Sequence, residues 1–144
     1  MTDHDQAMIE LVNRWFTEVW NQGRSEAMDE ILAPGCIVYG INDAQGNPLQ
    51  GPAGFRPFHQ VLRGALPDIH ITVEDCVVSG DKIAVRCHVT ATHQGDTLGI
   101  AATQNKVEFT GMAIVRVEGG MIVEAWNNFD FLTMYQQVGM LPTL

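Results

Sequence analysis

Residues 107–128 read VEFTGMAIVRVEGGMIVEAWNN, and this stretch decides the fold class. Apolar side chains recur with a period of two on both sides of Gly119-Gly120, as expected for two strands joined by a tight hairpin. The pattern predicts strands over 107–118 and 121–128. Because these strands are neighbours in sequence and separated by so short a turn, we expect them to pair antiparallel.

The same period extends toward the N-terminus. It predicts strands over 69–78 and 82–93, separated by Ser79-Gly80-Asp81, and a short strand over 36–40. Two longer segments, 41–52 and 94–106, are rich in glycine and polar residues and are expected to be loops.

Helical spacing replaces the period of two elsewhere. Apolar residues three and four positions apart predict a first helix that Thr2 caps and Gly23 ends. Further helices are expected over 26–33, up to Leu66 and over 130–138. The helix ending at Leu66 begins either at Pro52, with a kink at Pro57, or near Arg56.

The order of these elements predicts an α+β fold in which a curved antiparallel sheet of five strands carries helices on one face around a cavity. With 144 residues, 46% of them hydrophobic, the chain is expected to form one globular domain over 1–144. Strand 107–118 is apolar on both faces, with Met112 and Ile114 on one and Phe109, Ala113 and Val115 on the other. We therefore expect a homodimer packed sheet to sheet.

A net charge of -9 excludes nucleic acid and anionic membrane surfaces as expected partners. No apolar run is long enough for a membrane span, and the first residues, MTDHDQ, do not resemble a secretory signal. Three cysteines without a C-x-x-C motif indicate reduced thiols. The chain is therefore expected to be cytoplasmic.

Few residues stand out as candidates for chemistry, and no metal or nucleotide motif is visible, so we expect no metal and no cofactor. Asp130 follows Trp126-Asn127-Asn128-Phe129 and could be a desolvated acid–base group, or the cap of the last helix. His93 ends a strand beside a long loop and could assist it, or could hydrogen-bond the loop backbone. Tyr39 could donate to a ligand, or be an ordinary strand aromatic.

Several short motifs carry a family resemblance: Trp20-Asn21-Gln22-Gly23-Arg24, Gly51-Pro52, Pro67-Asp68, Gly80-Asp81, Thr92-His93-Gln94-Gly95, Gly111, Arg116, the run 120–126, Asp130 and Gln137-Val138-Gly139. In this order the chain resembles the SnoaL-like polyketide cyclases of the NTF2-like superfamily, from Leu11 to Pro142. The resemblance implies a cone-shaped α+β barrel, commonly dimeric, with a deep pocket and no cofactor.

The resemblance also implies an aldol cyclisation in which an Asp exchanges protons with the substrate and a His assists. Those positions match Asn127 and Ala113 here, and neither side chain can exchange a proton near neutral pH. The family's pocket positions match Trp20, Val38 and Phe58. The segment 99–105 lacks the prolines that many relatives carry after the Thr-His-x-Gly motif.

The leading hypothesis is a polyketide cyclase-like protein that acts by cofactor-independent acid–base chemistry on a hydrophobic small molecule. Polycyclic compounds are among the expected substrates. In it Asp130 is the general acid and base and His93 its helper, while Trp20, Tyr39, Phe58, Trp126 and Asn127 bind the ligand, with Asn127 orienting a carbonyl. The alternatives are another NTF2-like enzyme (an isomerase, a hydrolase or a cofactor-independent hydroxylase) and a binding protein without catalysis.

Overall fold

A computed structural model describes residues 1–142 of the chain. The helical elements are α1 (Asp3–Arg14), the π-helix η1 (Trp15–Asn21), α2 (Ala27–Ile31), α3 (Gly51–Ala65) and α4 (Phe131–Gln137). The strands are β1 (Leu32–Asn42), β2 (Pro48–Gln50), β3 (His70–Ser79), β4 (Lys82–Thr92), β5 (Lys106–Glu118) and β6 (Met121–Phe129).

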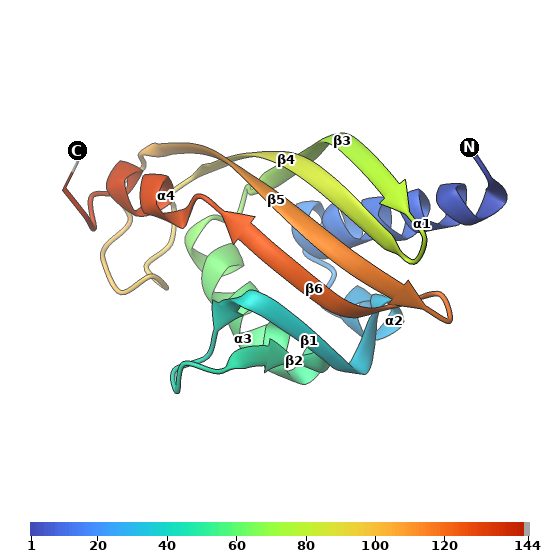
Figure 1. Ribbon diagram of the computed structural model, residues 1–144. Coiled ribbons are helices and arrows are strands. Elements are labelled where there is room, and N and C mark those ends of the chain that lie inside the picture. Colours follow the sequence, from blue (N-terminus) through green and yellow to red (C-terminus); the bar gives the residue numbers. More distant parts are fainter. Residues whose placement is uncertain (143–144) are drawn as a thin grey trace.

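The strands form one curved sheet in the order β2-β1-β6-β5-β4-β3, and the predicted α+β fold is confirmed (Figure 1). Helices α1, η1 and α3 lie along one side of the sheet, with α3 against β1 and η1 against β3. The sheet differs from the predicted antiparallel sheet of five strands in two respects. There are six strands, and β1 pairs with β6 in parallel. The sheet also stays open, with β2 and β3 as its edges.

Strand β1 is longer than predicted and begins directly after α2. Leu32 already pairs with Ile122 of β6, and the register then shifts before Ile37 pairs with Glu124. This irregularity accommodates Pro34, because a proline in a sheet is tolerated at a bulge where no ladder hydrogen bond is required. Part of the predicted loop 41–52 forms β2, in which buried Leu49 pairs with Val38.

The first predicted helix changes form halfway along its length. After α1 the chain continues as a π-helix, closed by a bond from the Gln22 amide to the Thr17 carbonyl at 2.9 Å. The Asn21 side chain fixes this segment to the edge of the sheet: it donates to the Ile71 carbonyl (3.0 Å) and accepts from the Ile71 amide (2.7 Å). Arg63 of α3 donates to the Trp20 carbonyl at 2.8 Å. Contacts with the rest of the fold therefore stabilise the wider turn.

Helix α3 begins at Gly51 and continues through Pro57 to Ala65. Pro57 is exposed, so the interruption of the hydrogen-bond ladder falls on the solvent side of the helix. The earlier of the two predicted starting points is therefore the right one.

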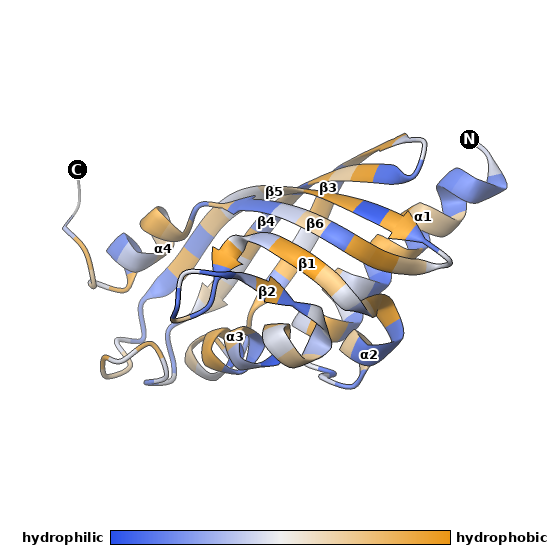
Figure 2. Cartoon of the chain, turned by 60° about the horizontal axis from the view of Figure 1, so that its bottom comes forward, coloured by the Kyte–Doolittle hydropathy of each residue, from blue (hydrophilic) through white to orange (hydrophobic). Residues whose placement is uncertain are grey.

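The apolar core lies between the inner face of the sheet and the helices. Figure 2 shows hydrophobic residues, in orange, in both the strands and the helices that enclose it. Strands β4 and β5 alternate between buried and exposed residues along most of their lengths. No helix in residues 1–142 is long and apolar enough to cross a membrane.

Candidate functional site

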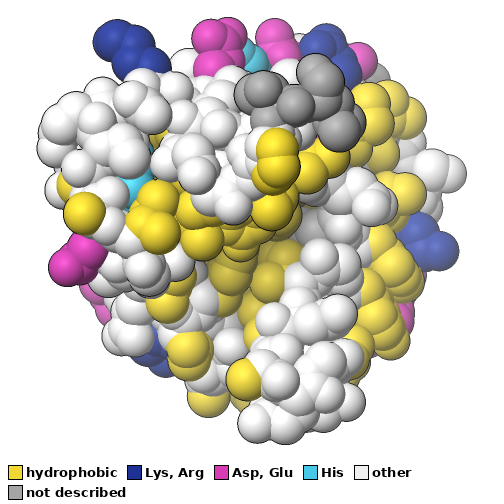
Figure 3. Space-filling view, turned by 90° about the vertical axis from the view of Figure 1, so that its left-hand side faces the viewer, with side chains coloured by type: hydrophobic (Ala, Val, Ile, Leu, Met, Phe, Trp, Pro, Cys, Tyr) yellow, Lys and Arg dark blue, Asp and Glu magenta, His cyan; other side chains and the backbone are white. Residues whose placement is uncertain are grey.

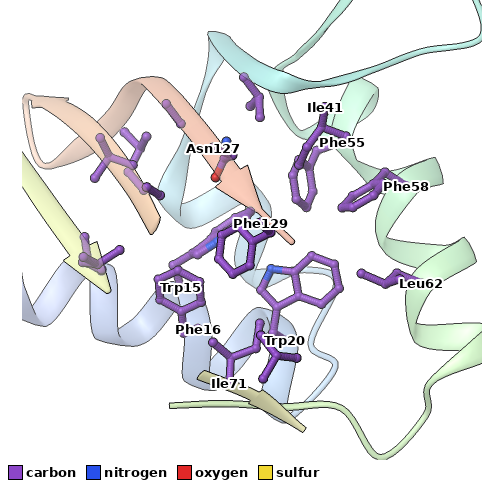
Figure 4. Close-up of a pocket in the computed structure, with 18 of the residues that line it drawn as sticks. Trp15, Phe16, Trp20, Ile41, Phe55, Phe58, Leu62, Ile71, Asn127 and Phe129 are labelled. Atoms are coloured by element: carbon purple, nitrogen blue, oxygen red, sulfur yellow. The ribbon is translucent and has the colours of Figure 1, made fainter. Parts of the chain in front are cut away.

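A cavity lies between the inner face of the sheet and the helices η1 and α3 (Figure 4). Strands β5 and β6 contribute their inward side chains, among them Ala113, Asn127 and Phe129. The helices contribute mainly aromatic rings, namely Trp15, Phe16, Trp20, Phe55 and Phe58. The walls are almost entirely apolar, as expected for a site that takes a hydrophobic ligand.

The molecule is hollowed at the end where α4, the 93–105 loop and the β1–β2 turn lie (Figures 1 and 3). Hydrophobic side chains line the hollow, while charged side chains stand at the periphery of this face (Figure 3). Phe58, Phe129 and Phe131 line the cavity and are only half-buried, whereas Phe16, Trp20 and Phe55 are buried. The half-buried rings therefore lie nearest to solvent.

Aromatic rings fill much of the space between the walls. Phe58 lies edge-on to Trp20 at 6.0 Å and to Phe131 at 6.1 Å between ring centroids. The remaining cavity has a volume of about 60 Å³, far below the roughly 300–1,000 Å³ of typical small-molecule pockets. A ring-bearing ligand can enter only if some of these side chains move, and the half-buried ones are the least confined.

Gly111 explains the position of Phe129. The two residues are cross-strand partners, and a Cβ on Gly111 would lie 2.2 Å from the Phe129 ring. The ring therefore covers the glycine on the inner face of the sheet, and any side chain at position 111 would displace it.

Among residues 1–142, Asn127 is the one lining residue with a carboxamide, and no lining residue has a titratable side chain. Its nitrogen donates to the Tyr39 carbonyl of β1 at 3.1 Å. Ala113 is its cross-strand partner on β5 and lines the same cavity. The two positions at which the resemblance implies an Asp and a His are thus adjacent, but the residues present cannot transfer protons.

Asp130 is placed outside the cavity. It is exposed at the N-cap of α4, where it accepts from the Thr133 amide (3.1 Å) and from the Thr133 hydroxyl (2.6 Å). These bonds lower the pKa of the Asp130 carboxyl, the opposite of what burial among aromatic rings would do. The geometry is that of the helix cap named as the alternative, and it gives the predicted catalytic role no support.

His93 is fully buried but does not line the cavity either. Its Nδ1 accepts from the Thr103 amide at 3.2 Å and lies 2.9 Å from the Thr103 hydroxyl. Its backbone also bonds with Asn105 and Gln104. His93 thus closes the 93–105 loop on itself, which matches the structural alternative for this residue. Among the described residues its Nε2 has no hydrogen-bond partner.

Tyr39 and Trp126 lie on the outer face of the sheet. They stack at 5.9 Å between ring centroids, and the Lys82 ammonium stands 5.7 Å above the Trp126 ring. Because Ala125 and Asn127 face inward, the alternation of the strand turns Trp126 outward. Of the five predicted ligand contacts, the cavity therefore brings together Trp20, Phe58 and Asn127 only.

Phe129 and Phe131 are among the lining residues that were not predicted for the site. The position of Phe129 could have been inferred from the sequence, because it lies two residues beyond Asn127 on the same strand face.

His59 is buried and bonds to the Val19 carbonyl at 2.7 Å, and burial lowers the pKa of its imidazole. Within residues 1–142 no cluster of three or more His, Cys, Asp or Glu side chains could hold a metal ion.

The fold is an NTF2-like α+β cone, and this cavity is an apolar site in its interior. Solved structures with similar folds support this description of the fold. A family model described as SnoaL-like polyketide cyclase matches residues 10–138. The chain therefore belongs to the SnoaL-like polyketide cyclase family.

Three solved structures illustrate the relationship. IdmH of Streptomyces antibioticus, a candidate polyketide cyclase, is 31% identical, with a TM-score of 0.78 over 90% of this chain and 96% of IdmH. A candidate SnoaL-like cyclase from Jannaschia sp. CCS1 is 23% identical, with a TM-score of 0.80 over 95% and 94%. AclR of Streptomyces galilaeus, a candidate hydroxylase, is 24% identical, with a TM-score of 0.78 over 97% and 83%. No curated protein matches the chain at a significant level.

Proposed function

We propose that the chain binds a hydrophobic, ring-forming small molecule of polyketide type in this cavity and favours its cyclisation by holding it in a reactive conformation. The observation that carries the proposal is the composition of the walls, which combine aromatic rings with one carboxamide and contain no titratable side chain. Positioning alone can lower a barrier considerably, because it removes the entropic cost of bringing the reacting atoms together. No protein side chain exchanges a proton with the ligand in this mechanism.

A binding experiment tests the location of the site. We expect 1-methoxynaphthalene, a neutral bicyclic probe, to bind the wild type in isothermal titration calorimetry. Phe58→Arg should weaken binding at least about tenfold, because it places a charge among apolar walls. Val61→Arg is the matched control, since Val61 lies on the same helix but is 42% exposed and does not line the cavity. Equal loss in both variants would overturn the proposal, and so would a wild type that binds neither this probe nor its hydroxyl analogue 1-naphthol.

A second experiment tests the absence of acid–base catalysis. The Ala113→His/Asn127→Asp variant restores both groups that the family resemblance implies, at adjacent inward positions. We expect this variant, with its fold intact by circular dichroism, to close a tricyclic methyl-ester polyketide by aldol addition, while the wild type does not. A wild-type reaction with a bell-shaped pH profile would contradict the proposal. A native ligand recovered unchanged after long incubation would favour simple carriage.

We propose in addition that the outer face of the sheet joins two copies of the chain. Val77, Met112 and Ile114 are 63%, 58% and 45% exposed there, around a groove of about 430 Å³. Asp75 and Arg86 line the same groove with opposite charges, so two copies related by a two-fold axis can pair them reciprocally.

The free, buried Cys36 and Cys87 fit a reducing compartment, and we place the protein in the cytoplasm on that ground.

Light scattering at micromolar concentration tests the assembly. We expect the mass of a dimer for the wild type and of a monomer for Ile114→Arg, because a buried unpaired charge opposes association. Leu132→Arg is the control, since Leu132 is 51% exposed on α4, away from this face. A monomeric wild type would exclude the dimer.

A further inference from the structure

The orientation of the Asn127 carboxamide is determined by its surroundings. Its nitrogen donates to the backbone carbonyl of Tyr39, and a carbonyl can only accept. The close approach of β1 to β6 is possible because residue 40 is glycine with φ 91°. A Cβ at this position would lie 2.0 Å from the backbone carbonyl oxygen of Asn127. The backbone of β1 therefore fixes which end of the amide faces the strand and which end faces the cavity.

The end that faces the cavity is the oxygen. In Figure 4 the Asn127 oxygen points toward the aromatic rings of the site, and its nitrogen points away from them. Among the described residues no side chain or backbone group donates to this oxygen. An acceptor held against apolar walls gains free energy only from a donor that enters with the ligand or from a water molecule.

We propose that Asn127 makes the cavity selective for ligands that present a hydroxyl group, as an alcohol, enol or phenol, rather than a carbonyl at this position. A hydroxyl donates to the Asn127 oxygen, whereas a ligand carbonyl would place two acceptors opposite each other. This inference rests on the proposed function, and it reverses the expectation that Asn127 orients a carbonyl.

The neighbouring residues agree with a hydroxyl attached to a flat ring. Ala113, the cross-strand partner of Asn127, leaves room beside the amide because its side chain is a single methyl group. Phe129 lies two residues further along the same strand face and offers a ring for stacking. A hydroxylated ring can thus contact Phe129 with its face and Asn127 with its edge.

Two probes that differ only in the donor test the proposal: 1-naphthol has a hydroxyl, and 1-methoxynaphthalene carries a methyl group on the same oxygen. We expect calorimetry to show 1-naphthol binding the wild type at least about tenfold more tightly. In Asn127→Leu the ratio of the two affinities should fall to about one, since a methyl group replaces the acceptor. Asn13→Leu, a change on exposed α1, should preserve the wild-type ratio.

A further variant covers the case in which Asn127→Leu does not fold. Asn127→Asp keeps the shape and an acceptor oxygen, so it should retain the preference for 1-naphthol. A wild type that binds both probes equally, or the methyl ether more tightly, would overturn the hydroxyl selectivity and leave cavity binding intact. Binding of neither probe would overturn the proposed function and this inference together.

Discussion

Asp130 illustrates how one side chain can have two readings in a sequence. In the sequence it lies between Phe129 and Phe131, which suggests an aromatic environment. In the structure both of its carboxyl oxygens accept hydrogen bonds from Thr133 at the start of α4. We expect Asp130→Ala to lower the melting temperature by a few degrees, because the amide of Thr133 loses its acceptor, and to leave binding of 1-methoxynaphthalene unchanged.

The pH dependence of this effect has a definite sign. The folded pKa of Asp130 lies below its usual value of 3.8, so the carboxylate stabilises the fold above that pH and loses its effect as the pH falls below it. In thermal melts of both proteins between pH 7 and pH 3, the difference in melting temperature should therefore shrink toward the acid end. A variant that melts like the wild type but no longer binds the probe would return Asp130 to the site.

Strand alternation decided which predictions of single residues succeeded. Asn127 and Trp126 are neighbours, and a one-residue step puts one in the cavity and the other on the outer face. The sequence marks both residues as notable but does not say which face is inner when both faces carry apolar side chains. Trp20 and Phe58 were easier to predict, since their helices have only one apolar stripe.

Two elements are held to the sheet by the same kind of contact, in which a side-chain amide both donates to and accepts from the backbone of one strand residue. Asn21 does this for η1 at Ile71. Gln137 does it for α4, accepting from the Glu108 amide (2.8 Å) and donating to the Glu108 carbonyl (2.9 Å). Because Phe131 of α4 lines the cavity, the Gln137 contact holds one wall of the site in place.

We expect Gln137→Glu to loosen α4, because a carboxylate cannot donate to the Glu108 carbonyl. Amide hydrogen exchange of residues 131–138 should become faster, and the free energy of unfolding should fall by about 1–2 kcal/mol. Gln60→Glu on α3 makes the same charge change at an exposed position and serves as the control. Unchanged exchange in α4 would show that its apolar contacts alone hold it.

The boundaries of an element could be predicted where its apolar residues alternate regularly. The predictions failed where a segment becomes a strand because of the strand it pairs with. Strands β4 and β5 were predicted to within a residue or two, because their alternation is continuous. Pro34-Gly35 falls between a predicted helix and a predicted strand, and Pro48 falls in a predicted loop. Both segments are strands, since β6 and the Val38 region of β1 supply partners that local sequence does not reveal. The π-helix was equally hidden, because its stabilising contacts come from Arg63 and Ile71.

The molecule as a whole should lose stability at alkaline pH. Burial raises the pKa of Cys36 to about 11 and that of Cys87 to about 12, while an unfolded thiol ionises near 9. Between those values unfolding releases a proton from each thiol, so the free energy of unfolding falls as the pH rises above 9. Urea denaturation of the wild type should show this decline. Cys36→Ala/Cys87→Ala should show a flatter one, and parallel curves would contradict the assignment.

The π-helix gives the fold an unusual tolerance for one particular change in chain length. A π-turn holds one residue more than an α-turn, so it has the form of a single-residue insertion absorbed within a helix. Removing one residue between Trp15 and Trp20 would restore regular α-helix and leave the residues on either side facing about as they do now. The same deletion within α1 has no wide turn to absorb it, so it would rotate everything on one side of the deletion by about 100° relative to the other. This short segment is therefore a place where a one-codon deletion can remodel the wall of the ligand site in a single step without turning the rest of the helix away from the sheet.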